Sequence, residues 1–267
     1  MLVKRPSATI VNEPDIFRQM EYAGRVCTNT LHRMDENKAL DFVTKRAQTR
    51  EFSVLEHAGI DVTNEMPKLD LLDEDSPEFG LVMSRAVLGG IRCSDLVQYS
   101  SHHRDPFTWA DLPRDRTILT FDVTCSRATA QQLERHRNLS FCERSLRYVK
   151  LSKDTFEMCT ADPESNSNNR TFMKAAETAL DCYLELLDSG YSADDARKVL
   201  PLGTATRVVV TAQWSWWLDV LSKRYHRRAS REMILLMQEL YKLMPEQIDH
   251  VVDNNLQKQF DEADRYV

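Results

Sequence analysis

The sequence predicts an α+β fold that is dominated by helices and built on a modest central sheet, antiparallel or mixed. The chain contains only seven glycines and nine prolines, so few residues interrupt a helix. Its C-terminal part shows helical periodicity over long stretches, which predicts long C-terminal helices. Residues 117–124 (TILTFDVT) are rich in β-branched and aromatic side chains and therefore predict a strand.

The chain is expected to form a single domain over residues 1–267. Its length and its hydrophobic content of 42% suffice to bury a sizeable core. In the N-terminal part, residues 13–27 predict a helix with Pro14 in its first turn, and residues 35–50 predict a second helix. Residues 59–115 are less regular, with an acidic stretch and a Gly-Gly pair. We expect an elaborated excursion there, at about 59–116.

Several local signals delimit the elements that follow the strand at 117–124. Ser126 is a suitable N-cap for a helix from 127 to about 137, and Gly190 suits the end of a helix. Ser192 and Asp195 resemble a capping box at the start of a short helix that Pro201 ends. The other expected elements are one or two strands in 147–158, a polar loop at 162–169, helices at 171–188, 206–225 and 228–243, and a helical tail from 245.

Composition argues against some classes of function. The formal net charge is -6, whereas proteins that mainly bind nucleic acid are usually basic. The six cysteines form no C-x-x-C pair and show no zinc-like spacing with histidine, so we expect free thiols and no metal. The sequence has neither an apolar signal core nor an apolar run of about 20 residues. We therefore expect a cytoplasmic protein that does not contact membranes.

Residues 131–148 (QQLERHRNLSFCERSLRY) contain the densest group of charged side chains. Arginine forks bind phosphate or carboxylate oxygens in pairs. Five cations accompany only two carboxylates, Glu134 and Glu143, which leaves a local positive excess in a net-negative chain. This excess is expected of a site for an anionic ligand, but an exposed amphipathic helix with ion pairs one turn apart would also show it. The cations are Arg135, His136, Arg137, Arg144 and Arg147.

The order of these residues resembles the signature of flavin-dependent thymidylate synthases. That signature is commonly written RHRxxSxNExSxRY, and residues 135–148 are RHRNLSFCERSLRY. Every fixed position agrees except one, where Cys142 stands in place of asparagine. A motif with so many fixed positions is highly specific. The chain is therefore identified as a divergent member of this family.

Other stretches resemble the family's pattern and follow in the same order. They are SVLEH at 53–57, the segment 120–127 leading into the helix that contains Gln132, YVKLS at 148–152, ARKVLPL at 196–202, and Thr206-Arg207 followed by Arg224. The resemblance covers about 13–243. The exception is about 59–116, where the family typically has a much shorter connection.

The resemblance implies the family's fold and the reductive methylation of dUMP to dTMP. In this family methylene tetrahydrofolate supplies the carbon, NADPH reduces FAD, and FAD passes a hydride to the nucleotide, while the protein orients the reactants. The resemblance also implies a homotetramer whose sites are shared between subunits.

Roles for individual residues follow from the same resemblance. Arg147 and Arg197 suit the phosphate of dUMP. Arg224 suits charge that develops on the pyrimidine ring, and Ser145 suits polarisation of the ring, so these two are the candidate catalytic residues. The candidate dUMP-binding residues are Gln132, Arg135, Glu143, Ser145, Arg147, Arg197 and Arg224. The candidate FAD-binding residues are Ser53, Arg135, His136, Arg137, Glu143, Gln213, Ser215 and Asp219.

The sequence departs from the family's pattern mainly on the flavin side. The departures are Glu51 for histidine, Gln213, Ser215 and Asp219 for Asn, Arg and Asn, and RRASR at 227–231. Ser215 removes a cation from the flavin phosphates, which Lys223, Arg227 or Arg228 could replace, and Asp219 could repel a phosphate. Two alternatives stay open for this reason. One is a variant pyrimidine deoxynucleotide enzyme, such as a hydroxymethylase or an enzyme acting on dCMP; the other is a non-catalytic nucleotide-binding homologue.

Some conspicuous side chains have plainer interpretations. Without the resemblance, His57 is best interpreted as a satisfied histidine of a helix. Trp214, Trp216 and Trp217 fit core or interface packing better than stacking on a flavin. Cys142 fits packing better than nucleophilic chemistry, because the neighbouring carboxylate disfavours a thiolate.

Overall fold

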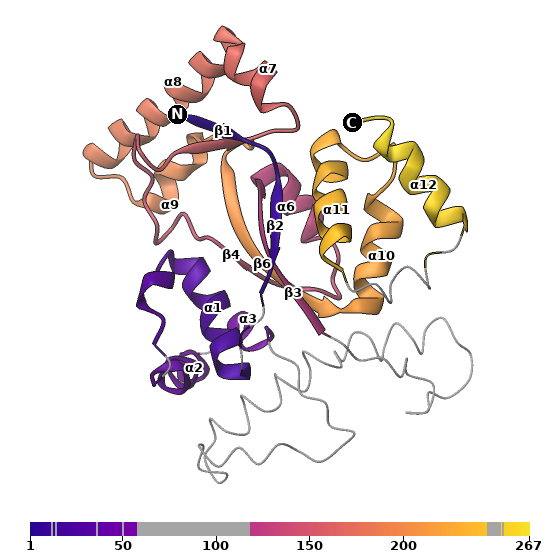
Figure 1. The fold of residues 1–267 in the computed structure, drawn as a ribbon. Helices are drawn as coiled ribbons and strands as arrows, with labels where there is room; N and C mark the ends of the chain where they lie inside the picture. The colour runs from indigo at the N-terminus through magenta and orange to yellow at the C-terminus, as the bar shows by residue number, and fades with distance from the viewer. Residues whose placement is uncertain are drawn as a thin grey trace.

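The computed structural model describes residues 1–11, 13, 15–35, 37–49, 51–57, 118–244, 252 and 254–267. The expected excursion at about 59–116 lies outside these residues, as does Pro14. Within the described ranges the protein combines two small sheets with a larger number of helices (Figure 1). The predicted helix-dominated α+β class is confirmed.

The central sheet has four strands in the order β2–β3–β6–β4, and all neighbours are antiparallel. Strands β3 and β6 form its axis, because they pair from Ile118↔Gln213 to Ser126↔Ala205. A separate parallel pair joins β1 to β5. The strands are β1 (Leu2–Lys4), β2 (Ser7–Ile10), β3 (Ile118–Ser126), β4 (Ser140–Glu143), β5 (Glu157–Cys159) and β6 (Ala205–Gln213).

The helix predicted at 206–225 was wrong in its first half, which forms strand β6. Its sequence, ATRVVVTAQ, is rich in valine and threonine, whose branched Cβ atoms favour strands. Val208 and Val210 pack into the core on one face of the sheet, and Val209 packs into the core on the other. Because both faces are covered, the strand lacks the polar alternation of a half-exposed strand. Only the second half of the predicted helix is helical, as α10 (Trp214–Arg224).

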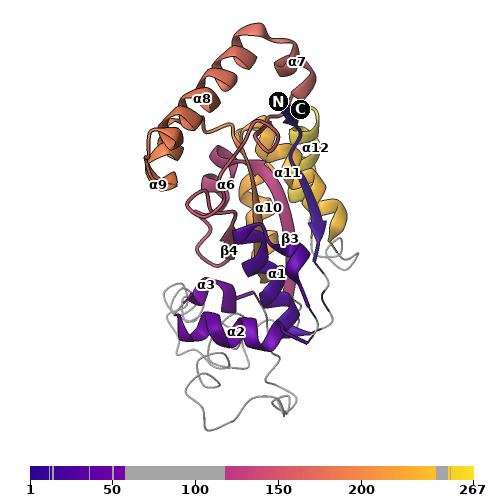
Figure 2. The same cartoon turned by 90° about the vertical axis from the view of Figure 1, so that its left-hand side faces the viewer.

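Helices cover both faces of the central sheet (Figures 1 and 2). The larger core lies under α10, α11 and α12, where Trp217 meets Phe121 edge to face at a centroid distance of 4.9 Å. The second core lies under α1, α2 and α3 and includes Cys142. The helices not yet delimited are α1 (Ile16–Thr28), α2 (Ala39–Gln48), α3 (Phe52–Leu55), α11 (Arg231–Leu243) and α12 (Asn254–Asp264). The predicted packing role of Trp217 is confirmed.

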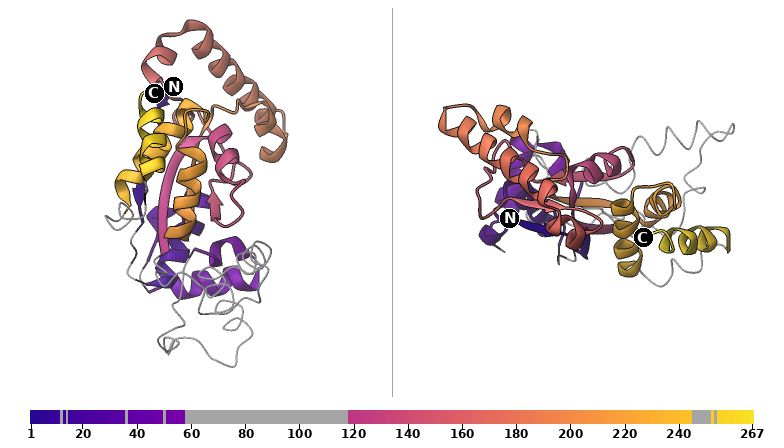
Figure 3. Two further views of the ribbon diagram at one scale, coloured as in Figure 1. Left: turned by 90° about the vertical axis from the view of Figure 1, so that its right-hand side faces the viewer. Right: turned by 90° about the horizontal axis from the view of Figure 1, so that it is seen from above.

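A third core lies away from the central sheet, between β5 and the long helix α8 (Figure 3). Helix α8 agrees with the prediction, and Gly190 follows it with a φ of 86°, a conformation that glycine adopts readily. Ser192 caps the next helix through the backbone of Asp195, as predicted. The elements here are α7 (Pro163–Asn168), α8 (Arg170–Asp188), α9 (Ala193–Ala196) and the 3-10 helix η3 (Arg197–Val199).

Several predicted boundaries were wrong. Helix α6 (Arg127–Leu133) begins after its predicted cap Ser126 but ends earlier than residue 137. In 147–158 only the end is a strand, the start of β5. The polar loop predicted at 162–169 is mostly α7, which Asp162 caps and Pro163 begins. Strands β1, β2 and β4 were not predicted, because each is only three or four residues long.

A buried polar network ties α1 to the central sheet. The Tyr22 hydroxyl donates to Asp122 Oδ2 at 2.7 Å, and Arg207 Nε donates to both carboxylate oxygens at 2.8 Å. The Asp122 side chain is only 3% exposed. Burial, together with the Asp122 carboxylate, raises the pKa of Tyr22 to about 12. Tyr22 therefore stays protonated at neutral pH and keeps donating to Asp122.

Across the described residues, none of the helices has both the length and the apolar content that crossing a lipid bilayer requires.

Candidate active site

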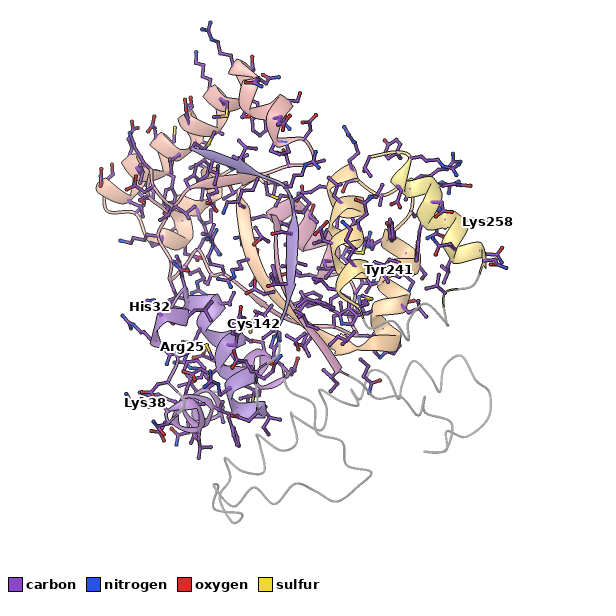
Figure 4. All side chains as sticks on the ribbon, in the orientation of Figure 1. Arg25, His32, Lys38, Cys142, Tyr241 and Lys258 are labelled. Carbon is purple, nitrogen blue, oxygen red and sulfur yellow. The ribbon has the colours of Figure 1, made fainter. Side chains whose placement is uncertain are left out.

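The signature stretch at 135–148 is not a helix. It leaves α6, forms β4 and ends in turns, so the alternative of an amphipathic helix for its charges is wrong. Within β4 the side chains alternate. Cys142 belongs to the core under α1 and α3, where Figure 4 labels it, and Glu143 pairs with Val208 on β6.

Cys142, the one departure inside the signature, is buried at 4% exposure. Burial is the main cause that raises the pKa of its thiol far above the usual value, and a hydrogen bond from Ser53 opposes this in part. A thiol held neutral in this way is a poor nucleophile. Its place in the core agrees with the predicted packing role.

Two of the candidate arginines meet at one carboxylate. The Asp194 Oδ1 atom lies 2.6 Å from a terminal nitrogen of Arg197 and 3.4 Å from Arg147 Nε. The Arg147 side chain is 58% exposed and that of Arg197 33% exposed. Arg147 lies in a turn, where its own backbone N–H donates to Ser145 Oγ at 3.3 Å. We call Arg147, Asp194 and Arg197 the Asp194 group.

The third candidate arginine, Arg224, lies at the end of α10 against the end of α6. Its Nε donates to His136 Nε2 at 2.8 Å, and a terminal nitrogen donates to the backbone oxygen of Gln132 at 2.9 Å. A histidine nitrogen that accepts a hydrogen bond carries no proton. Burial, followed by the charge of Arg224, lowers the pKa of His136 to about 4, in agreement with this arrangement. We call Gln132, His136 and Arg224 the His136 group.

Arg135 lies close to the His136 group. Burial is the main cause that lowers the pKa of Arg224, and the charge of Arg135 contributes to the same shift. Arg135 and Arg137 are exposed, whereas the His136 side chain between them is buried. The alternation therefore places the cations Arg135 and Arg137 at the surface on either side of the buried His136.

Glu143 ends β4 and forms an ion pair with Arg127, the first residue of α6, at 3.1 Å. Both side chains are mostly buried, at 22% and 20% exposure. Arg144 donates to the backbone oxygen of Ala205 at 2.6 Å. The pKa of Glu134 is raised, first by partial burial and then by the nearby charge of Glu143. Arg127 was not predicted as a site residue, because no local spacing relates residue 127 to residue 143.

The structure does not bring all three candidate arginines into one group of the same chain. Arg147 and Arg197 share Asp194, a residue of α9, whereas Arg224 lies at the end of α10. Helices α9 and α10 lie apart in both views, and Figure 1 shows them on different sides of the long strands β3 and β6 (Figures 1 and 2). The candidate site is therefore divided into two halves within one chain.

The candidate flavin residues outside the signature stretch lie on α3 and at α10. Gln213 is the half-buried residue at the N-terminal end of α10, and Ser53 is an exposed residue of α3. Asp219 lies one turn before Lys223 on α10, and an ion pair of 2.7 Å between them offsets the charge that could repel a phosphate. The side chains of Ser215 and Trp214 lie outside the described part of the structure.

His57 and Glu51, two further residues considered from the sequence, contact other side chains of the protein. His57 is fully buried, and its Nδ1 lies 2.8 Å from Thr211 Oγ1, which in turn contacts Thr120 Oγ1 at 2.8 Å. Glu51 forms an ion pair with Arg46 at 2.7 Å. In the part of the chain that the structure describes, no three His, Cys, Asp or Glu side chains gather as metal ligands would.

Comparison with known proteins gives a family match and similar curated relatives. A family model described as thymidylate synthase complementing protein matches residues 111–248. A flavin-dependent thymidylate synthase from Geobacter sulfurreducens is 34% identical over 133 residues, which are 49% of this chain and 57% of that protein. A flavin-dependent thymidylate synthase from Thermococcus onnurineus is 32% identical over 124 residues, 45% of this chain and 51% of that protein. The chain thus matches about half the length of these curated relatives.

Among solved structures, the UMP/dUMP methylase PolB from Streptomyces cacaoi, bound with 5-Br dUMP, is 19% identical and has a TM-score of 0.47. The match covers 91% of this chain and 91% of that chain.

Proposed function

We propose, from the premise that the chain belongs to the thymidylate synthase complementing protein family, that it catalyses the reductive methylation of dUMP to dTMP. The proposed carbon donor is methylene tetrahydrofolate, the hydride carrier is FAD and the reductant is NADPH. One observation carries the proposal: Arg147 and Arg197 come from separate stretches of the sequence, and both reach one carboxylate.

The Asp194 group is the proposed phosphate-binding half of the site. Two guanidinium groups that already share one anion are close enough to share a phosphate, which offers them three acceptor oxygens. Both side chains are exposed enough to meet a ligand from solvent. Ser145 lies in the turn just before Arg147, and we propose that its hydroxyl contacts the same nucleotide.

The His136 group is the proposed pyrimidine-binding half. His136 and the Gln132 backbone occupy two nitrogens of Arg224 and so fix the orientation of its guanidinium. A fixed cation next to the ring favours the transition state, in which negative charge develops on the ring oxygens. Glu143, oriented by Arg127, is the proposed acceptor for donor groups of the nucleotide.

The charges of the candidate flavin residues are compatible with an anionic cofactor. Arg135 and Arg137 are exposed cations, and Lys223 balances Asp219. FAD would be held by Arg135, by Arg137 and by the start of α10 near Gln213. The hydroxyl of Ser53 on α3 would provide a further contact. When bound, FAD would supply the hydride that completes the methyl group. His136, neutral at pH 7, would keep Arg224 in place beside it.

We further propose a homotetramer in which the two halves of each site come from different subunits. The separation of α9 from α10 within one chain supports this arrangement. Residues 1–267 would form one domain, with an elaborated excursion at about 59–116.

The test is to incubate purified protein with dUMP, FAD, NADPH and methylene tetrahydrofolate and to identify the product by mass. We expect dTMP, and we expect the purified protein to carry FAD and look yellow. A hydroxymethyl nucleotide, or turnover of dCMP only, would replace the proposal by a variant enzyme. Nucleotide binding without flavin or product would indicate a non-catalytic homologue.

A further inference from the structure

Asp194 makes a contact that no catalytic assignment explains. It is the carboxylate that Arg147 and Arg197 approach, and its Oδ1 atom is buried between them. Despite the 2.6 Å distance to Arg197, this oxygen has no hydrogen bond of acceptable angle among the described residues. Charge attraction, rather than aligned donors, therefore dominates the contact.

An ion pair of this kind is easily exchanged. The three side chains of the Asp194 group are between 33% and 58% exposed, and ion pairs that are exposed to solvent contribute little to stability. A phosphate group presents about two negative charges and three acceptor oxygens to the same guanidinium forks. If Asp194 stayed in place, its negative charge would lie beside the phosphate and repel it.

We propose that Asp194 competes with the phosphate of the nucleotide for Arg147 and Arg197, and thereby determines which anions the site accepts. A ligand with one negative charge would have to displace a tethered carboxylate of equal charge, which has a high effective concentration. A phosphate monoester carries more negative charge and offers more acceptor oxygens to the two guanidinium groups, so it displaces the Asp194 carboxylate. The inference rests on the proposed function, because it takes the Asp194 group to be the phosphate-binding half.

The neighbouring carboxylate provides a matched control. Asp195 lies on the same short helix and is 53% exposed, similar to the 46% of Asp194, but its Oδ1 contacts Lys198 at 2.7 Å instead of the two arginines. Asp194→Asn and Asp195→Asn each remove one negative charge from the same turn. General electrostatics would change both variants alike, whereas competition for the arginines changes only the first.

The experiment measures dissociation constants of dUMP, deoxyuridine and inorganic phosphate by calorimetry for the full-length wild type and both variants. We expect Asp194→Asn to bind dUMP about fivefold more tightly, as expected when an exposed ion pair no longer competes. Asp195→Asn should stay within about twofold of the wild type. Deoxyuridine, which lacks the phosphate, should bind all three proteins equally. Equal thermal midpoints, within about 2 °C, would show that the variants are folded.

The outcomes separate this inference from the proposed function. If the wild type binds dUMP and Asp194→Asn binds it equally or more weakly, the competition is refuted and Asp194 positions the arginines instead. A gain that both variants share would also refute it. If no protein binds dUMP but Asp194→Asn gains affinity for inorganic phosphate, the competition stands and the proposed function fails.

Discussion

The two halves of the candidate site use the same residue type under different physical conditions. In the His136 group, Arg224 is fixed by two directed hydrogen bonds, at 2.8 and 2.9 Å, to acceptors that carry no charge. In the Asp194 group, Arg147 is exposed, Arg197 is partly exposed, and both meet a carboxylate through charge. The first arrangement keeps a cation in one orientation, and the second leaves two cations able to exchange their anion.

This difference indicates a division of labour. Stabilising charge that appears only during the reaction requires a preorganised group, because reorientation at that moment would cost free energy. Binding a phosphate requires a group that can release one anion and accept another.

Replacing Arg224 should have the largest effect. Arg224→Lys keeps the charge but loses the fork that reaches both His136 and the Gln132 backbone. We expect dTMP formation to fall about 100-fold or more, in the range seen when a preorganised charge-stabilising donor is removed. The rate constant under saturating substrates is the measurement. Arg197→Lys serves as the comparison, and a larger loss in that variant would contradict the division of labour.

Acidification should act through the His136 group. The folded protein lowers the pKa of His136 to about 4 from an ordinary value of 6.5. The unfolded chain therefore takes up this proton first as the pH falls, and the stability present above pH 6.5 is lost on the way to pH 4. After allowance for solvent screening we expect a loss of about 1–2 kcal/mol. Urea unfolding from pH 7 to pH 4 measures it. His136→Asn should show a flatter dependence, and an unchanged slope would show that His136 is not responsible.

The Arg127–Glu143 pair is more buried than the Asp194 group. Arg127→Met leaves the Glu143 carboxylate mostly buried without its partner. We expect the affinity for dUMP to fall about tenfold, because removing one member of a partly desolvated charge pair costs more than an exposed pair contributes. Titration with dUMP measures the loss. Combining the change with Glu143→Gln should add little further loss; fully additive effects would mean that the two residues act independently.

The smallest effect is expected at Arg147, the most exposed side chain of the Asp194 group. Arg147→Gln should weaken dUMP binding a few-fold, and salt should screen the difference. The comparison is the dissociation constant of dUMP at low and high ionic strength for both proteins. A salt dependence as steep in the variant as in the wild type would remove Arg147 from the phosphate-binding half.

Much of the fold could be predicted because its signals are local. The β-branched run before Ser126 gave β3, and the Ser126 and Ser192 caps marked helix starts that the structure confirms. Strand β6 was missed for a physical reason. It is covered on both faces and lies between β3 and β4, so its apolar residues do not alternate and resemble a buried helix.

The site was predictable only where a known pattern supplied it. The resemblance picked out Arg147, Arg197 and Arg224, and the first two are indeed neighbours in space. Asp194 and Arg127, which contact these or other candidate residues, were not predicted. Their partners are chosen by tertiary packing, and a single sequence contains no local signal for such a contact.

A mixing experiment tests most directly whether the two halves act on one nucleotide across subunits. Arg197→Ala damages one half and Arg224→Ala the other, so each variant alone should form little dTMP. Dissociating and reassociating the two variants together should restore activity, because some sites then combine an intact Asp194 group from one subunit with an intact His136 group from another. Persistent inactivity of mixed oligomers, with subunit exchange verified by mass, would contradict the account.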